Sequence, residues 1–180
     1  MNSFSRVWLA VAFIALAGCL SVPVSTMWKL ARFDRTALLA IDPKDLRAAA
    51  LVDQRATMKN VTMKLTLTPK DGQPADYEVL LTEPVNHDAR LPAAPKGRRW
   101  EIFALTPDGQ RDFLRMREAA LKLPAGSSLT LALSAREGNV PPELMRSFPL
   151  RLDLVLDAKE GWFTVLNDTE LDLTQLAQKG

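Results

Sequence analysis

Hydrophobic and polar residues alternate at every second position through the middle and the end of this chain. Segment 61–68, VTMKLTLT, places Val61 and three further apolar residues on one face and threonines with Lys64 on the other. Strict period-two alternation is typical of a strand with one buried face. A turn signal at 69–72 and a second alternating run, DYEVLLT, follow directly, and together they predict a hairpin.

Four more stretches predict strands. Segment 98–105, RRWEIFAL, is apolar on both faces and predicts a buried central strand, whereas segment 128–135 alternates again. Segment 148–157, FPLRLDLVLD, shows four leucines on one face and Arg151, Asp153 and Asp157 on the other. After a turn, WFTVL is expected to return antiparallel to it.

Segment 42–52 combines two opposing signals. Asp42 followed by Pro43 and an alanine triplet is typical of a helix start. The spacing of Leu46, Ala48, Ala50 and Val52 fits a strand. We favour the strand and keep the helix as the alternative.

One amphipathic helix is expected within 106–124. Thr106 is a suitable N-cap, Pro107 fits the first helical position, and Pro124 ends the helix. The apolar stripe comprises Phe113, Met116, Ala120 and Leu123, widened by Leu114 and Leu121. The helix therefore packs on a sheet and is inserted between two strands.

These elements predict a mainly β fold: an antiparallel β-sandwich of about six to seven strands, with polar outer faces and one inserted amphipathic helix. Apolar residues in the proline-bounded loop 138–149 are expected to cover one end of the sandwich, with a partner-binding patch as the alternative.

The first 18 residues have the three parts of a secretory signal. Arg6 lies in a short polar start, an apolar run spans 7–16, and small residues stand at 17 and 18. The run is about half the length that a membrane-spanning helix needs. Residues 1–18 are thus expected to form a signal peptide.

The four residues Leu16-Ala17-Gly18-Cys19 resemble the lipobox of bacterial lipoproteins. The resemblance implies that Cys19 receives a diacylglyceryl thioether, that the peptide is cut before it, and that the new amino group is acylated. An ordinary signal peptide is the alternative, but it would leave one unpaired thiol in an oxidising compartment. Leu20 follows in place of an inner-membrane retention aspartate, which favours an outer-membrane anchor facing the periplasm.

Cleavage before Cys19 leaves 162 residues, of which 19–26 form a lipidated tether and 27–180 a single domain. Segment 27–33, MWKLARF, either plugs the base of this domain or lies at the membrane interface, with Trp28 among the lipids. The mature net charge of about +1 gives no electrostatic basis for nucleic-acid binding.

Residue types for known catalytic chemistry are scarce. The mature chain has one histidine, His87, and its cysteine is expected to be acylated, so a zinc site or a serine triad is not expected. Asp168, Glu170 and Asp172 stand at period two, which fits either a cation or catalytic site or the solvated face of a last strand. We favour the solvated face, and expect no cofactor and no enzymatic activity.

Basic residues beside an aromatic ring remain as candidates for contact with a partner or lipid headgroups. The candidates are Trp28, then Lys96, Arg98 and Arg99 beside Trp100, and Arg111, Arg115 and Lys122 along the helix. A charged loop and a solvated helix face are the alternatives.

The leading hypothesis is a membrane-anchored, non-enzymatic binding or scaffold domain that presents loops or an edge strand to an envelope protein. In architecture this is similar to small lipoproteins of envelope machines, such as the sandwich lipoprotein of type VI secretion. A carrier or sensor of an apolar ligand such as lipid is the alternative, and a carboxylate-based envelope hydrolase is the third hypothesis.

Overall fold

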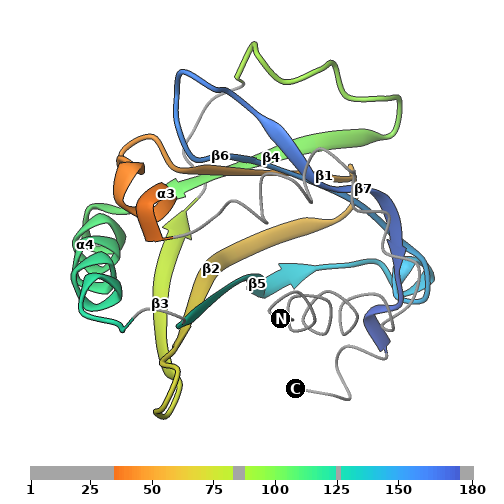
Figure 1. Cartoon of the computed structure of the whole chain (residues 1–180). Helices are drawn as coiled ribbons and strands as arrows, with labels where there is room; N and C mark the ends of the chain where they lie inside the picture. The colour runs from red at the N-terminus through yellow and green to blue at the C-terminus, as the bar shows by residue number, and fades with distance from the viewer. Residues whose placement is uncertain (1–34, 83–87, 125–126, 175–180) are drawn as a thin grey trace, which may run out of the picture.

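A computed structural model describes residues 35–82, 88–124 and 127–174. Seven strands form one antiparallel sheet in the order β5-β2-β3-β4-β1-β6-β7 (Figure 1). The elements in chain order are α3 (Arg35–Ala40), β1 (Arg47–Asp53), β2 (Thr57–Thr68), β3 (Ala75–Thr82), β4 (Arg98–Leu105), α4 (Pro107–Leu121), β5 (Ser128–Asn139), η1 (Pro142–Leu144), β6 (Phe148–Val155) and β7 (Phe163–Leu171). The mainly β, antiparallel prediction is confirmed. Within the described ranges, no helix has the length and apolar character needed to cross a bilayer.

The sheet curls into two halves with a sandwich-like arrangement. Among the described residues, β3 and β4 pair at Leu81↔Leu105 and Thr82↔Ala104, and the two strands run in different directions in Figure 1, where the sheet curls. The half β5-β2-β3 and the half β4-β1-β6-β7 both contribute side chains to one core, among them Leu65 and Phe103. The period-two faces predicted for β2 and β3 are the buried faces.

Helix α4 closes the curled sheet where β3 and β4 separate (Figure 1). The Thr106 hydroxyl accepts the Gly109 N–H at 2.9 Å, which is the predicted N-cap, and Phe113 and Met116 are buried in the core. At Gly109 a Cβ atom would lie 2.6 Å from the Leu80 carbonyl oxygen, so this close approach of helix and strand requires glycine. The predicted inserted helix is confirmed, but Leu121, which was expected to widen its apolar stripe, is exposed because it lies past the edge of the face that buries Phe113, Met116 and Ala120.

Segment 42–52, in which helix and strand signals conflict, forms a turn followed by strand β1, so the strand that we favoured is confirmed. Asp42 caps a turn by accepting the Lys44 N–H at 2.9 Å, and the chain then extends into β1. The five central residues of β1 are all buried. Small and branched side chains at these positions fit between two covered faces, which explains why helix-like composition here forms a strand.

The outer face of β1 differs from the polar outer faces that the pattern predicted. Ala49 and Leu51, which point away from the core, are as buried as the core residues. The segment before β4 folds over this face (Figure 1): Leu91 is buried, and the Trp100 Nε1 donates to the Pro92 carbonyl at 2.8 Å. This half of the sandwich therefore has a second, smaller covered layer.

Strand β7 also departs from simple alternation. Its pairing with β6 shifts register near Leu152, and Asp168 has a positive φ of 40°. Asn167 and Asp168 are both exposed, whereas Thr169 is buried between the exposed Asp168 and Glu170, as expected for a strand with outward carboxylates. In the loop 138–149, Val140 and Leu144 pack against the core, as expected for a segment that covers one end.

Candidate functional site

The two adjacent arginines that open β4 lie on opposite faces of the sheet. Arg98 shares the outer face with Trp100, because residues two apart in a strand point the same way. Arg99 shares the inner face with Glu101, to which it donates a hydrogen bond, and it also donates to the Ala56 carbonyl at 3.0 Å. The basic patch expected around Lys96, which is exposed in the preceding loop, is thus divided between two environments.

Arg98 connects four strands on the outer face. One guanidinium nitrogen donates to Asp168 on β7, and the other donates to the Leu51 carbonyl of β1 at 2.6 Å and to the Pro149 carbonyl of β6 at 3.4 Å. Only 17% of the Arg98 side chain is exposed, against 55% for Asp168. Arg98 therefore mainly stabilises the fold, and little of its guanidinium is accessible to a lipid headgroup.

A second ion pair lies beside it. Arg151 donates from Nε and Nη2 to the two oxygens of Asp153, each at 3.0 Å, and Nη2 also donates to the Thr164 hydroxyl at 3.0 Å. The Asp153 side chain is almost fully buried, and its hydrogen bond is the main cause that raises the pKa of Arg151. The pattern placed Asp153 on a solvated face, and the bidentate partner is what allows its burial.

The Arg151 guanidinium also lies over the Trp100 ring, 5.5 Å from the ring centroid. We call Arg98, Trp100, Arg151, Asp153, Thr164 and Asp168 the Trp100 cluster. It carries two cations and two carboxylates held in fixed pairs, so its charges are balanced. Asp168 is the exposed member of the cluster and the other five are partly or fully buried, so the cluster reaches solvent mainly at the β7 edge.

The other predicted contact residues have separate environments. Arg111 pairs with Asp108, and Arg115 pairs with Asp112, three residues earlier on α4 in both cases. Lys122 is exposed at the C-cap. The basic row on the helix is therefore largely neutralised by its own acidic neighbours. Cys19, Trp28 and His87 lie outside the described residues.

The carboxylates considered for catalysis bond to different groups. Asp157 accepts the Lys159 N–H, Glu170 accepts the Ser147 hydroxyl, and Asp172 accepts the Thr174 N–H. These are turn caps and surface hydrogen bonds. Across the part of the chain that the structure describes, no group of three or more histidine, cysteine or acidic residues is placed to hold a metal ion.

Asp88 fixes the covering segment to the sheet. It accepts hydrogen bonds from Arg90 at 2.7 Å and from the Trp162 Nε1 at 3.1 Å, and Arg90 donates to the Ala158 carbonyl at 3.3 Å. The Arg90 side chain is the main cause that holds the pKa of Asp88 well below its ordinary value. In the same way, Arg55 lowers the pKa of Asp53 to about 2.

These depressed pKa values predict acid sensitivity. Below about pH 4, the carboxylates of Asp53 and Asp88 take up protons in the unfolded chain but stay ionised in the native state. Their contribution to the free energy of unfolding is therefore present above that pH and is lost as the pH falls towards 2. We expect the urea midpoint to fall from pH 5 to pH 2.5 and to fall less in Asp88→Asn. The exposed turn substitution Asp71→Asn is the control, and an equal fall in parent and Asp88→Asn would contradict the assignment.

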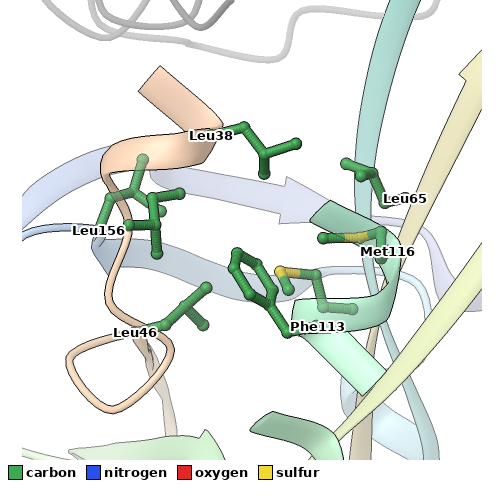
Figure 2. A pocket seen from close by; sticks show the side chains of 8 residues that line it. Leu38, Leu46, Leu65, Phe113, Met116 and Leu156 are labelled. Carbon is green, nitrogen blue, oxygen red and sulfur yellow. The ribbon is translucent and has the colours of Figure 1, made fainter. Parts of the chain in front are cut away.

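An apolar cavity lies between α3, α4 and the sheet (Figure 2). Leu38, Leu46, Leu65, Phe113, Met116 and Leu156 point into it. Its volume is about 10 Å³, roughly that of one water molecule, whereas small-molecule sites have hundreds of Å³. In this conformation the space under the helix does not hold a lipid.

From the sequence, Arg98 and Trp100 were predicted as part of a basic group and Asp168 as part of a separate acidic run. Their meeting with Arg151, Asp153 and Thr164 depends on strand order, which alternation does not specify. A usable signal was the opposite charges of Arg151 and Asp153 two residues apart on one strand face.

Comparisons of the chain with family models, with curated proteins and with solved structures found no match.

Proposed function

We propose that this chain is a lipid-anchored protein of the bacterial envelope whose domain is a non-enzymatic binding or scaffold module. The lipobox-like Leu16-Ala17-Gly18-Cys19, at the end of an apolar run, is the observation that carries the proposal. Two or three acyl chains on Cys19 suffice for stable membrane anchoring. The favoured location is the outer membrane, with the domain facing the periplasm.

The Trp100 cluster supports binding as the activity of the domain. Its arginines are held in place by Asp153 and Asp168, so few side-chain rotations are lost when a partner binds. Its charges are matched internally, which favours a protein surface with its own hydrogen-bonding groups over a strongly charged polymer. The adjoining Asn167 is exposed on the edge strand β7.

Site-specific photo-cross-linking in the native cell tests the proposal. A photoreactive residue replaces Asn167, next to the Trp100 cluster, and in a matched control it replaces Asp71 in the β2–β3 turn, which is also exposed. We expect one envelope protein to be captured from position 167 and not from position 71. The adduct should be lost in Arg151→Ala and reduced several-fold when Cys19→Ser releases the chain from the membrane.

Three outcomes would contradict the proposal. Equal capture from both positions would show that the cluster does not select a partner. Capture that is unchanged by Arg151→Ala, in a variant that circular dichroism shows to be folded, would place the contact elsewhere. Capture that is unchanged in Cys19→Ser would show that the contact does not need the membrane anchor.

A further inference from the structure

An exposed segment with two prolines leads into β4. Residues 92–96, Pro-Ala-Ala-Pro-Lys, lie outside the helices and strands, and all five are exposed. In Figure 1 the light green segment that contains them follows the top margin of the molecule before β4 begins. We call residues 92–96 the proline strip.

The two prolines restrict the backbone of the strip. A proline ring fixes φ at roughly −65°, and the residue before a proline is kept out of the helical region. These two rules restrict every residue from 91 to 95 except Ala93. Such a segment favours the extended polyproline II conformation, which has no internal hydrogen bonds and leaves its surface open to another molecule.

Hydrogen bonds and burial fix the strip at both ends. The Trp100 Nε1 donates to the Pro92 carbonyl at 2.8 Å, and the Arg98 N–H donates to the Pro95 carbonyl at 3.0 Å. Leu91, directly before the strip, is buried. A segment held in this way loses little conformational entropy when a partner binds it.

The strip and the Trp100 cluster form one arrangement. Trp100 and Arg98, which hold the strip, are members of the cluster, and Arg151 lies over the Trp100 ring, 5.5 Å from its centroid. Because most of the cluster is partly or fully buried, its side chains offer little area to a partner. The strip is the exposed segment that these residues hold in place.

We propose that the proline strip binds in a groove lined by aromatic side chains on the partner protein. This inference rests on the proposed function and names the class of surface that the partner presents. Extended proline segments bind such grooves because the conformation that fits is already formed before binding. Lys96 is exposed and has no ion-pair partner among the described residues, so we expect an acidic residue at the rim of the groove.

Photo-cross-linking from the strip tests the inference in the full chain in the native cell. A photoreactive residue replaces Ala94, and in a matched control it replaces Gln73, which is exposed beside Pro74 in the β2–β3 turn. We expect position 94 to capture the same envelope protein as position 167, and position 73 not to capture it. Tandem mass spectrometry should place the adduct from position 94 beside tryptophan or tyrosine residues of that protein.

Capture from position 167 then measures how much the strip contributes. The double variant Pro92→Ala/Pro95→Ala should reduce that capture several-fold, because the strip loses its preformed conformation. The matched double variant Pro69→Ala/Pro74→Ala, which removes two prolines from the β2–β3 turn, should leave it unchanged. Near-ultraviolet circular dichroism verifies that each variant is folded.

Reversing the charge of the strip tests the expected acidic rim. Lys96→Glu should weaken capture from position 167, whereas Lys70→Glu in the β2–β3 turn should not. Capture that is unchanged in the folded variant Pro92→Ala/Pro95→Ala, or an adduct that maps away from aromatic residues, would overturn the inference and leave the proposed function standing. Absence of capture from both 94 and 167 would overturn the proposed function and the inference with it.

Discussion

Glu101→Ala is expected to destabilise the domain by about 3 kcal/mol, because it removes a buried carboxylate, leaves the Met58 N–H without this partner and breaks the pair with the partly exposed Arg99. Glu101 is 2% exposed. Its carboxylate accepts the Met58 N–H at 2.9 Å and a hydrogen bond from Arg99. This pair stands where the chain crosses from β1 in one half of the sheet to β2 in the other.

The crossing explains the size of the effect. At the corner, the Ala56 carbonyl and the Met58 N–H are bonded by Arg99 and Glu101 in place of a neighbouring strand. A buried backbone group that loses its partner carries its full desolvation cost. Chemical denaturation at pH 7 measures the change, with the exposed helix substitution Glu118→Ala as the control at under about 0.5 kcal/mol.

Glu101→Gln separates charge from hydrogen bonding. The amide oxygen keeps the Met58 N–H bonded but loses the pairing with Arg99, so we expect a smaller loss than in Glu101→Ala. A Glu101→Ala variant as stable as the parent would show that the corner does not depend on this carboxylate.

Arg98→Ala is expected to cost about 2–3 kcal/mol, the second largest effect. The substitution removes the bonds to the Leu51 carbonyl and to Asp168 that connect β4 to β1 and β7. Because Asp168 is 55% exposed, solvent screens its share of the loss, and most of the cost comes from the carbonyls. It also frees Asp168, a non-glycine residue at positive φ, from the bond that holds its side chain.

Arg98→Lys should recover little of this stability, because an ammonium group lacks the planar fork that reaches several acceptors. The matched control is Arg111→Ala, which breaks the exposed pair with Asp108 on α4 and should cost under about 0.5 kcal/mol. Urea denaturation compares the three variants. Equal costs for Arg98→Ala and Arg111→Ala would contradict the bridging role of Arg98.

Local patterns were sufficient for much of the fold. The alternation in β2 and β3, the Thr106 cap and the apolar stripe of α4 each depend on neighbours within a few residues, and the structure confirms them. The buried outer face of β1 was not predictable in this way. Leu51 lies between Trp100 of β4 and Arg151 of β6, and no local period encodes these partners from distant strands.

The candidate site shows the same limit. Arg98 and Arg99 formed one basic patch in the sequence, but the strand pleat sends them to opposite faces with different partners. The exposed Asp168 and Glu170 fit the solvated face that we favoured, but Asn167 beside Asp168 is exposed as well, at the point where Asp168 has a positive φ. Cross-strand pairs such as Arg98–Asp168, seventy positions apart, arise from the strand order β4-β1-β6-β7.

Mass spectrometry of the mature protein, purified from its native membrane, tests the central claim of lipid anchoring most directly. We expect a chain that begins at Cys19 and carries a diacylglyceryl group, with or without a third acyl chain on the amino group. We also expect that Cys19→Ser abolishes this modification, whereas Ser21→Ala, two positions away, leaves it intact. A mature chain that begins elsewhere, or that carries an unmodified Cys19 thiol, would contradict the account.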